Sequence, residues 1–201
     1  MTPCCQHHRR LVTCMAIGIA TLAIGCTTLP FYPAPVVPTK SPLPYTAQVR
    51  LTELAAYMVE PGATLKQDPN LQNTVTQAKA VPAISAEEWD KSIVDYVTAR
   101  QTFRKIVPDG VADVIVVLRI FIFIDPGLKS EFSHTYIAKA DAVLKDPRNG
   151  SGLATYAGFG KAFGVVSRVS KEDDEGPINK SVQAALNDLF GKIEGDRRIL
   201  P

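Results

Sequence analysis

The sequence has very few of the residues that metal proteins and many enzymes use. All 4 cysteines, Cys4, Cys5, Cys14 and Cys26, lie at the N-terminus, and beyond His7 and His8 the only histidine is His134. No spacing typical of a zinc site, a calcium loop or a disulfide-exchange motif occurs, and there is no G-x-S-x-G nucleophile motif. We therefore expect no catalytic site, no bound metal and no cofactor, and hence a non-enzymatic protein.

The sequence also lacks an excess of charge of either sign. It has 22 basic and 20 acidic residues. Loss of an N-terminal leader would remove Arg9 and Arg10 and leave 20 basic residues against 20 acidic ones. A nucleic-acid partner requires a basic face that displaces counterions from phosphates, so the composition argues against such a partner.

A hydrophobic run long enough to cross a membrane is missing as well. The apolar run from Leu11 to Gly25 is shorter than the roughly 20 residues that a spanning helix needs. It follows the basic stretch His7–Arg10 and ends in the small residues Ala23 and Gly25, which is the layout of a secretory signal peptide. The sequence predicts a signal peptide over residues 1–25.

The residues at the end of this run, Ala23-Ile24-Gly25-Cys26, resemble the lipobox of bacterial lipoproteins. That resemblance implies cleavage before Cys26 and fatty acylation, with palmitate-like chains, of the cysteine. Thr27 stands where the Gram-negative inner-membrane signal would have Asp, so the resemblance further implies an anchor in the outer membrane, facing the periplasm. More than one acyl chain makes such an anchor stable.

Residues 26–47 are expected to form a linker between the lipid and a folded domain. The segment holds six prolines, Pro30, Pro33, Pro35, Pro38, Pro42 and Pro44. Proline-rich chains favour polyproline II at about 3.1 Å per residue, which predicts a stalk of up to roughly 50 Å. A disordered leader that limits aggregation is an equally weighted alternative.

Residues 48–201 are long enough for one domain, and hydrophobic periodicity divides them into strands and helices. A capping box at Ser85–Glu88 would begin the first helix, and Pro177 the second. The predicted strands are Gln48–Val59, Ala112–Ile124, Phe132–Leu144 and Leu153–Val166, and the predicted helices are Ala86–Lys105 and Pro177–Glu194. We expect an α+β fold of two layers, with a mainly antiparallel sheet of about four strands and both helices on one face.

The strand Ala112–Ile124 is apolar on both faces, so it should lie inside the sheet. If the helices cover its even-numbered side chains, the odd-numbered ones need another cover. These residues and two phenylalanines of the last strand form the candidate interaction surface, called the sheet-face surface below: Ile115, Val117, Phe121, Phe123, Phe159 and Phe163. An exposed apolar patch usually marks a partner site. The alternative is internal cover by the Pro61–Pro82 loop or by the folded-back stalk.

Three other features favour structural interpretations. His134 alternates onto the side of Phe132 and Tyr136, which suits a hydrogen-bonded structural histidine. The acidic stretch Glu172–Glu175 is typical of a solvated loop. The glycine-rich stretch Gly150–Gly164 lacks the spacing of a phosphate-binding loop, and its small residues instead predict a close backbone approach.

The patterns "ADVIVVLRIFIFID", "YIAKADAVLKDPRNG" and "INKSVQAALNDLF" resemble small α/β domains of periplasmic lipoproteins, including the N-terminal domain of the Tol system's periplasmic protein and the lipopolysaccharide-transport lipoprotein. The resemblance implies a non-enzymatic accessory or assembly factor that contacts another envelope protein. A carrier of a lipid-like or apolar ligand is the alternative, and an envelope hydrolase a third. The sequence names neither the partner nor the oligomeric state.

Overall fold

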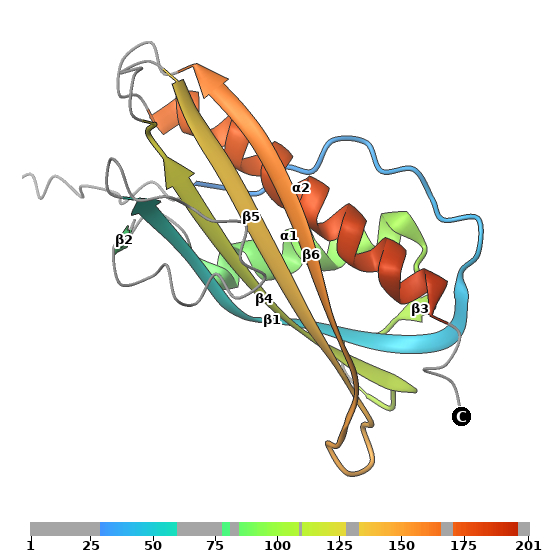
Figure 1. Cartoon of the computed structure of the whole chain (residues 1–201). Coiled ribbons are helices and arrows are strands. Elements are labelled where there is room, and N and C mark those ends of the chain that lie inside the picture. Colours follow the sequence, from blue (N-terminus) through green and yellow to red (C-terminus); the bar gives the residue numbers. More distant parts are fainter. Residues whose placement is uncertain are drawn as a thin grey trace, which may run out of the picture.

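A computed structural model describes residues 29–59, 78–80, 85–108, 110–127, 133–165 and 171–196. In these ranges one sheet is covered by two helices (Figure 1). The strands are β1 Leu43–Val59, β2 Ala78–Ala80, β3 Phe103–Ile106, β4 Val114–Asp125, β5 Ser133–Lys145 and β6 Gly152–Val165. The helices are α1 Ala86–Arg100 and α2 Lys171–Gly195.

The strands lie in the order β2-β1-β4-β5-β6, with β3 beside β1. β1 runs parallel to both β4 and β3, whereas the pairs β4–β5, β5–β6 and β1–β2 are antiparallel. The α+β class is confirmed, but the sheet is mixed and has six strands. Two of these are only 3 and 4 residues long, too short to show a period. The long connection through α1 carries the chain back so that β4 starts beside the start of β1.

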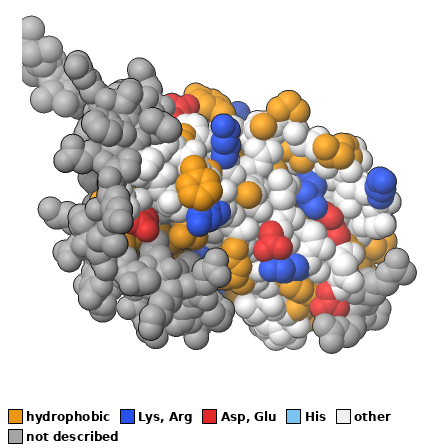
Figure 2. Space-filling view, turned by 45° about the horizontal axis from the view of Figure 1, so that its top comes forward, with side chains coloured by type: hydrophobic (Ala, Val, Ile, Leu, Met, Phe, Trp, Pro, Cys, Tyr) orange, Lys and Arg blue, Asp and Glu red, His pale blue; other side chains and the backbone are white. Residues whose placement is uncertain are grey.

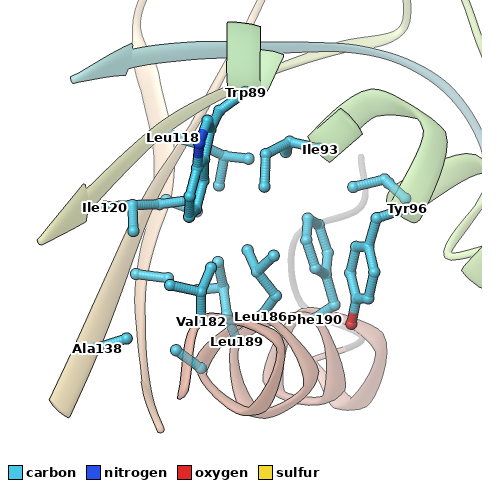
Figure 3. Packing of buried hydrophobic residues seen from close by; sticks show 14 of the residues in the cluster. Trp89, Ile93, Tyr96, Leu118, Ile120, Ala138, Val182, Leu186, Leu189 and Phe190 are labelled. Carbon is cyan, nitrogen blue, oxygen red and sulfur yellow. The ribbon is translucent and has the colours of Figure 1, made fainter. Parts of the chain in front are cut away.

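The core lies between the helices and the even-numbered face of β4. Leu118 and Ile120 of β4 are fully buried, and in Figure 3 they face side chains from both helices. Trp89 and Ile93 come from α1, and Leu186, Leu189 and Phe190 from α2. β4 lies between β1 and β5, so its expected position inside the sheet is also confirmed.

Glycines let α2 pack directly on the backbone of β6. A Cβ atom at Gly158 would lie 2.6 Å from the Cβ of Leu189, and one at Gly160 would collide with the backbone of Ser181 and Ala185. Both glycines are on the helix-facing side of β6, opposite Ala140 and Ala138 of β5. The close approach predicted from the small residues is confirmed.

The first helix is shorter than predicted. It ends at Arg100, because Gln101 adopts a left-handed backbone with φ 58° and its N–H donates to the carbonyl of Thr98. Phe103, expected on the helix, instead lies on β3 opposite Leu43 of β1. The predicted capping box is wrong as well, since the side chain of Ser85 makes no cap hydrogen bond.

The second helix is longer than predicted. It begins at Lys171, so the acidic stretch expected as a loop is helical and Pro177 lies inside the helix. A proline there lacks an N–H for the helical ladder. Its ring lies against β6 near Gly164, where a Cβ atom would be 2.6 Å from the Cγ of Pro177. The helix was expected to begin at Pro177. Packing against the sheet thus stabilises a helix that begins before this proline.

The proline-rich segment is packed on the helices from Leu29 onward, so the prediction of a projecting stalk is wrong for residues 29–47. Phe31 is 1% exposed and stacks on Trp89 with ring centroids 4.9 Å apart. Gln183 of α2 binds both the N–H and the carbonyl of Ala34, at 3.0 and 3.1 Å. β1 then begins at Leu43 rather than Gln48. The prolines suit this path because an extended segment crossing two helices uses few ladder hydrogen bonds.

A polar network fastens the end of this segment to both helices. Glu194 of α2 accepts two hydrogen bonds from Arg100 of α1, at 2.8 and 3.0 Å. It also accepts from the hydroxyls of Thr102 at 2.7 Å and Thr39 at 3.0 Å. Burial of the guanidinium works to lower the pKa of Arg100, but the hydrogen bonds and charge of Glu194 outweigh it and raise that pKa.

Candidate functional site

The strand register places the sheet-face surface on the side of the sheet opposite the helices. Phe121 lies opposite Lys139, which lies opposite Phe159, so these three side chains form one row across β4, β5 and β6. Phe163 lies opposite Thr135, nearer the end of β6. Since paired residues share a face, the odd-numbered positions of all three strands point the same way.

Exposure differs strongly within the sheet-face surface. Phe123 is 1% exposed and stacks on Tyr57 of β1 at 5.7 Å, within a small second apolar cluster. Phe159 is 39% exposed and Phe163 is 72% exposed. Ile115, Val117 and Phe121 are half-buried. In Figure 2, hydrophobic side chains alternate with charged ones on the face in view and form no single continuous patch.

A buried ion pair interrupts the apolar side chains of this face. Lys139 Nζ lies 3.1 Å from Asp141 Oδ2, and both residues are less than a tenth exposed. Arg119 lies 3.7 Å from the same oxygen and 6.0 Å from the ring centroid of Phe121. The paired charges satisfy one another locally, so the surface offers apolar contact between fixed charges.

Side chains of α2 form hydrogen bonds with the backbone of the edge strand β6 next to Phe159. Asp188 Oδ2 accepts a hydrogen bond from the N–H of Phe159 at 3.0 Å, and Lys192 Nζ donates to the carbonyl of Ala157 at 2.8 Å. Burial works to raise the pKa of Asp188, but the hydrogen bonds from Lys192 and Phe159 outweigh it and lower that pKa. An edge strand with such side-chain partners is a poor template for another strand, so we expect contacts through side chains rather than strand addition.

A groove of about 740 Å³ opens at the hairpin end of the sheet, beyond the area that the helices cover. Strands β1, β3, β4, β5 and β6 all contribute to its apolar lining, which includes Leu43, Tyr45, Phe103, Val114, Leu144 and Leu153. Val111 at its rim is 97% exposed. The sequence did not predict this groove, because β3 was assigned to the first helix and Val111 lies outside any periodic segment.

Two carboxylates beside the groove are expected to stay ionised in mildly acidic solution. Hydrogen bonds from the backbone and side chain of Thr46 lower the pKa of Asp113, and those from the side chain and backbone of Arg148 lower that of Asp146. Because the folded pKa values lie below 3.8, the contribution of these contacts to stability is complete above about pH 4 and is lost as the pH falls through the folded values.

Carboxyl-carbon NMR titration checks this prediction. We expect the midpoint of Asp146 to move up toward 3.8 in Arg148→Ala while that of Asp113 stays unchanged, since Arg148 contacts only the former. Equal midpoints for Asp146 in the two proteins would contradict it.

The other predicted sites fall in different places. Cys26 and Phe132 lie outside the described residues. The Tyr136 hydroxyl is 3.5 Å from Nδ1 of half-buried His134, in keeping with a structural role. Within the described ranges, no group of three or more His, Cys, Asp and Glu side chains is arranged to hold a metal ion. None of the helices in that part of the chain is both long and apolar enough to span a membrane.

Comparison with known proteins finds similar folds only. No protein-family model matches the sequence, and no curated protein matches it. A Xanthomonas campestris protein of the DUF330 family superposes with a TM-score of 0.50 at 9% identity, over 84% of this chain and 98% of that one. The likeness is one of fold.

Two further solved structures align less well. A presumed lipoprotein of Caulobacter crescentus has a TM-score of 0.34 at 12% identity, over 52% of this chain and 74% of that one. A presumed homologue of the neuraminyllactose-binding haemagglutinin of Helicobacter pylori has a TM-score of 0.40 at 9% identity, over 83% of this chain and 94% of that one.

Proposed function

We propose that this protein is a non-enzymatic lipoprotein of the Gram-negative envelope, anchored through Cys26 in the outer membrane and acting in the periplasm as an accessory or assembly factor. The middle of the sheet-face surface, around Phe121 and Phe159, docks another envelope protein. The observation that carries the proposal is the row Phe121–Lys139–Phe159, which presents aromatic rings on the side of the sheet opposite the helices. Aromatic side chains are enriched in protein interfaces.

The helix side of the sheet offers less room for a ligand. Side chains of α1 and α2 fill the space against β4 in the described part of the chain (Figure 3). Gly158 and Gly160 bring α2 into contact with β6. An apolar carrier with a cavity between helices and sheet is therefore disfavoured.

A carrier that uses the groove at the hairpin end is the second candidate. Its volume of about 740 Å³ lies within the range of small-molecule sites, roughly 300–1,000 Å³. Its lining is largely apolar, with Asp146 and Arg148 beside it. A ligand with an aliphatic body and a polar end fits this chemistry.

The docking proposal predicts the loss of one specific complex in a double variant. Phe121→Ser with Phe159→Ser removes both rings of the row and should abolish recovery of the partner that wild-type protein retains after crosslinking in cells. Val37→Ser is the matched control, because Val37 is 81% exposed in the N-terminal segment, away from the sheet-face surface. It should leave recovery unchanged.

Thermal melts establish that each variant is folded before the complexes are compared. Retention of the partner by the folded double variant would refute docking through this row. Loss of the partner on Leu153→Ser, with retention by the double variant, would assign binding to the groove instead, since Leu153 is 45% exposed and lines it.

A further inference from the structure

The folded domain begins almost immediately after the predicted lipid anchor. Leu29 is 5% exposed, and its carbonyl accepts a hydrogen bond of 2.6 Å from Nε1 of the buried Trp89. Leu29 comes only three positions after Cys26, with two residues between them. A fully extended chain of that length spans about 10 Å. A lipidated Cys26 therefore holds Leu29 within about 10 Å of the lipid surface, against the roughly 50 Å expected for a projecting stalk.

The tether joins the domain at one end of the sheet. Asn179 of α2 donates to the carbonyl of Pro30 at 3.2 Å and accepts from the N–H of Tyr32 at 2.6 Å. Two residues earlier on the helix, Pro177 lies against Gly164, near the end of β6. In Figure 1 the blue segment likewise starts beside the ends of β1 and β4, and the β5–β6 hairpin lies at the other end.

Exposed aromatic side chains lie at this tethered end. Tyr32 is 67% exposed and Phe163 is 72% exposed. The ammonium of Lys161 lies 4.9 Å from the ring centroid of Phe163. Aromatic rings with an adjacent lysine suit the headgroup region, where rings meet acyl chains and cations meet phosphates. Tyr32, Phe163 and Lys161 are thus side chains that can contact a membrane surface.

The groove lies at the far end of the same strands. Leu153, which lines it, precedes Phe163 by ten residues along β6, or about 33 Å at the rise of an extended strand. Val111 at the groove rim is 97% exposed. One end of the molecule is therefore held close to the lipid. The other end lies about 30 Å from this tethered end along the strands.

We propose that the domain rests directly on the bilayer, with the Tyr32 and Phe163 end against the headgroups and the groove turned away from the membrane. The surface that contacts the tethered end is that of the bilayer. The inference rests on the proposed lipidation of Cys26 and adds a distance and an orientation to it. A partner approaching from the periplasm then meets the groove end and the middle of the sheet first.

Depth-dependent quenching tests this orientation on the full mature protein. Ser133→Cys places a thiol at the exposed start of β5 at the tethered end, and Val111→Cys places one at the groove rim. Each purified protein is labelled with a thiol-reactive fluorophore and reconstituted in phosphatidylethanolamine and phosphatidylglycerol vesicles that carry a headgroup nitroxide quencher. We expect quenching several-fold stronger at position 133 than at position 111.

A third protein tests the role of the short tether. A flexible Gly/Ser insertion between Thr27 and Thr28 in the Ser133→Cys chain should reduce quenching at position 133 to the level seen at position 111. Equal quenching at the two positions without the insertion would overturn the orientation, as would stronger quenching at 111. Unchanged quenching after the insertion would overturn the assignment of the orientation to the tether.

Failure of the underlying proposal gives a different result. The unsubstituted mature chain has Cys26 as its only thiol. It takes up fluorophore only if the sulfur of Cys26 is unmodified or the leader is retained. Labelling of that chain therefore refutes lipidation, whereas an unlabelled chain with equal quenching at 133 and 111 refutes only the orientation.

Discussion

Replacing Gly160 with alanine is expected to lower the free energy of unfolding by about 3 kcal/mol. The new Cβ would collide with the backbone of Ser181 and Ala185 and approach the Cβ of Ala184 to 2.9 Å. Backbone atoms of a packed helix cannot rotate away as a side chain can. The helix would have to move off β6, and contacts along the whole interface would weaken. Chemical denaturation measures the loss.

The matched control for this change is Gly191→Ala. Gly191 lies on the exposed side of the same helix, and a Cβ there meets nothing within 4 Å. Alanine in a helix interior is favoured over glycine by roughly 0.5–1 kcal/mol, so this variant should be slightly more stable than wild type. Equal stability of the Gly160→Ala and wild-type proteins would show that α2 does not pack on β6 as described.

Replacing Glu194 with alanine is expected to cost about 3 kcal/mol. The change removes the acceptor of the two hydrogen bonds from Arg100 and of those from Thr39 and Thr102. The side chains of Arg100 and Glu194 are only 14% and 10% exposed. Removing one partner therefore leaves a charge that water solvates poorly. The N-terminal segment should also pack less tightly on the helices, because Thr39 loses its hydrogen bond to Glu194.

A double-mutant cycle with Arg100→Ala separates the pair from its surroundings. If the interaction is direct, the loss in the double variant is smaller than the sum of the two single losses. Glu87→Ala, in the exposed first turn of α1, is the charge-matched control and should change stability by less than about 0.5 kcal/mol. A large loss in the control, or additive losses in the cycle, would contradict this role of Glu194.

Long periodic segments allowed most of the fold to be predicted. The apolar residues on both faces of β4 predicted its position inside the sheet. The small residues of β6 predicted close packing. Neither inference needed a long-range contact as input, because a period of two in a buried strand is a local signal.

The errors arose where long-range contacts override local signals. Proline spacing suggested a stalk, but Phe31 stacks on Trp89, which also donates a hydrogen bond to the carbonyl of Leu29, and the segment crosses the helices. Phe103 continued the helical period of α1, yet pairing with β1 draws it into β3. The groove is formed where these segments meet the hairpin, and so it could not be predicted from periodicity.

Lipid anchoring of this protein depends on the sulfur of Cys26. Mass spectrometry of the mature protein purified from its native membrane tests it. We expect a chain that begins at Cys26 and carries fatty acyl groups on that residue, and we expect Cys26→Ser to lose both the modification and membrane retention. A free Cys26 thiol, or a chain that still carries its leader, would contradict a lipid-anchored protein held flush with the bilayer.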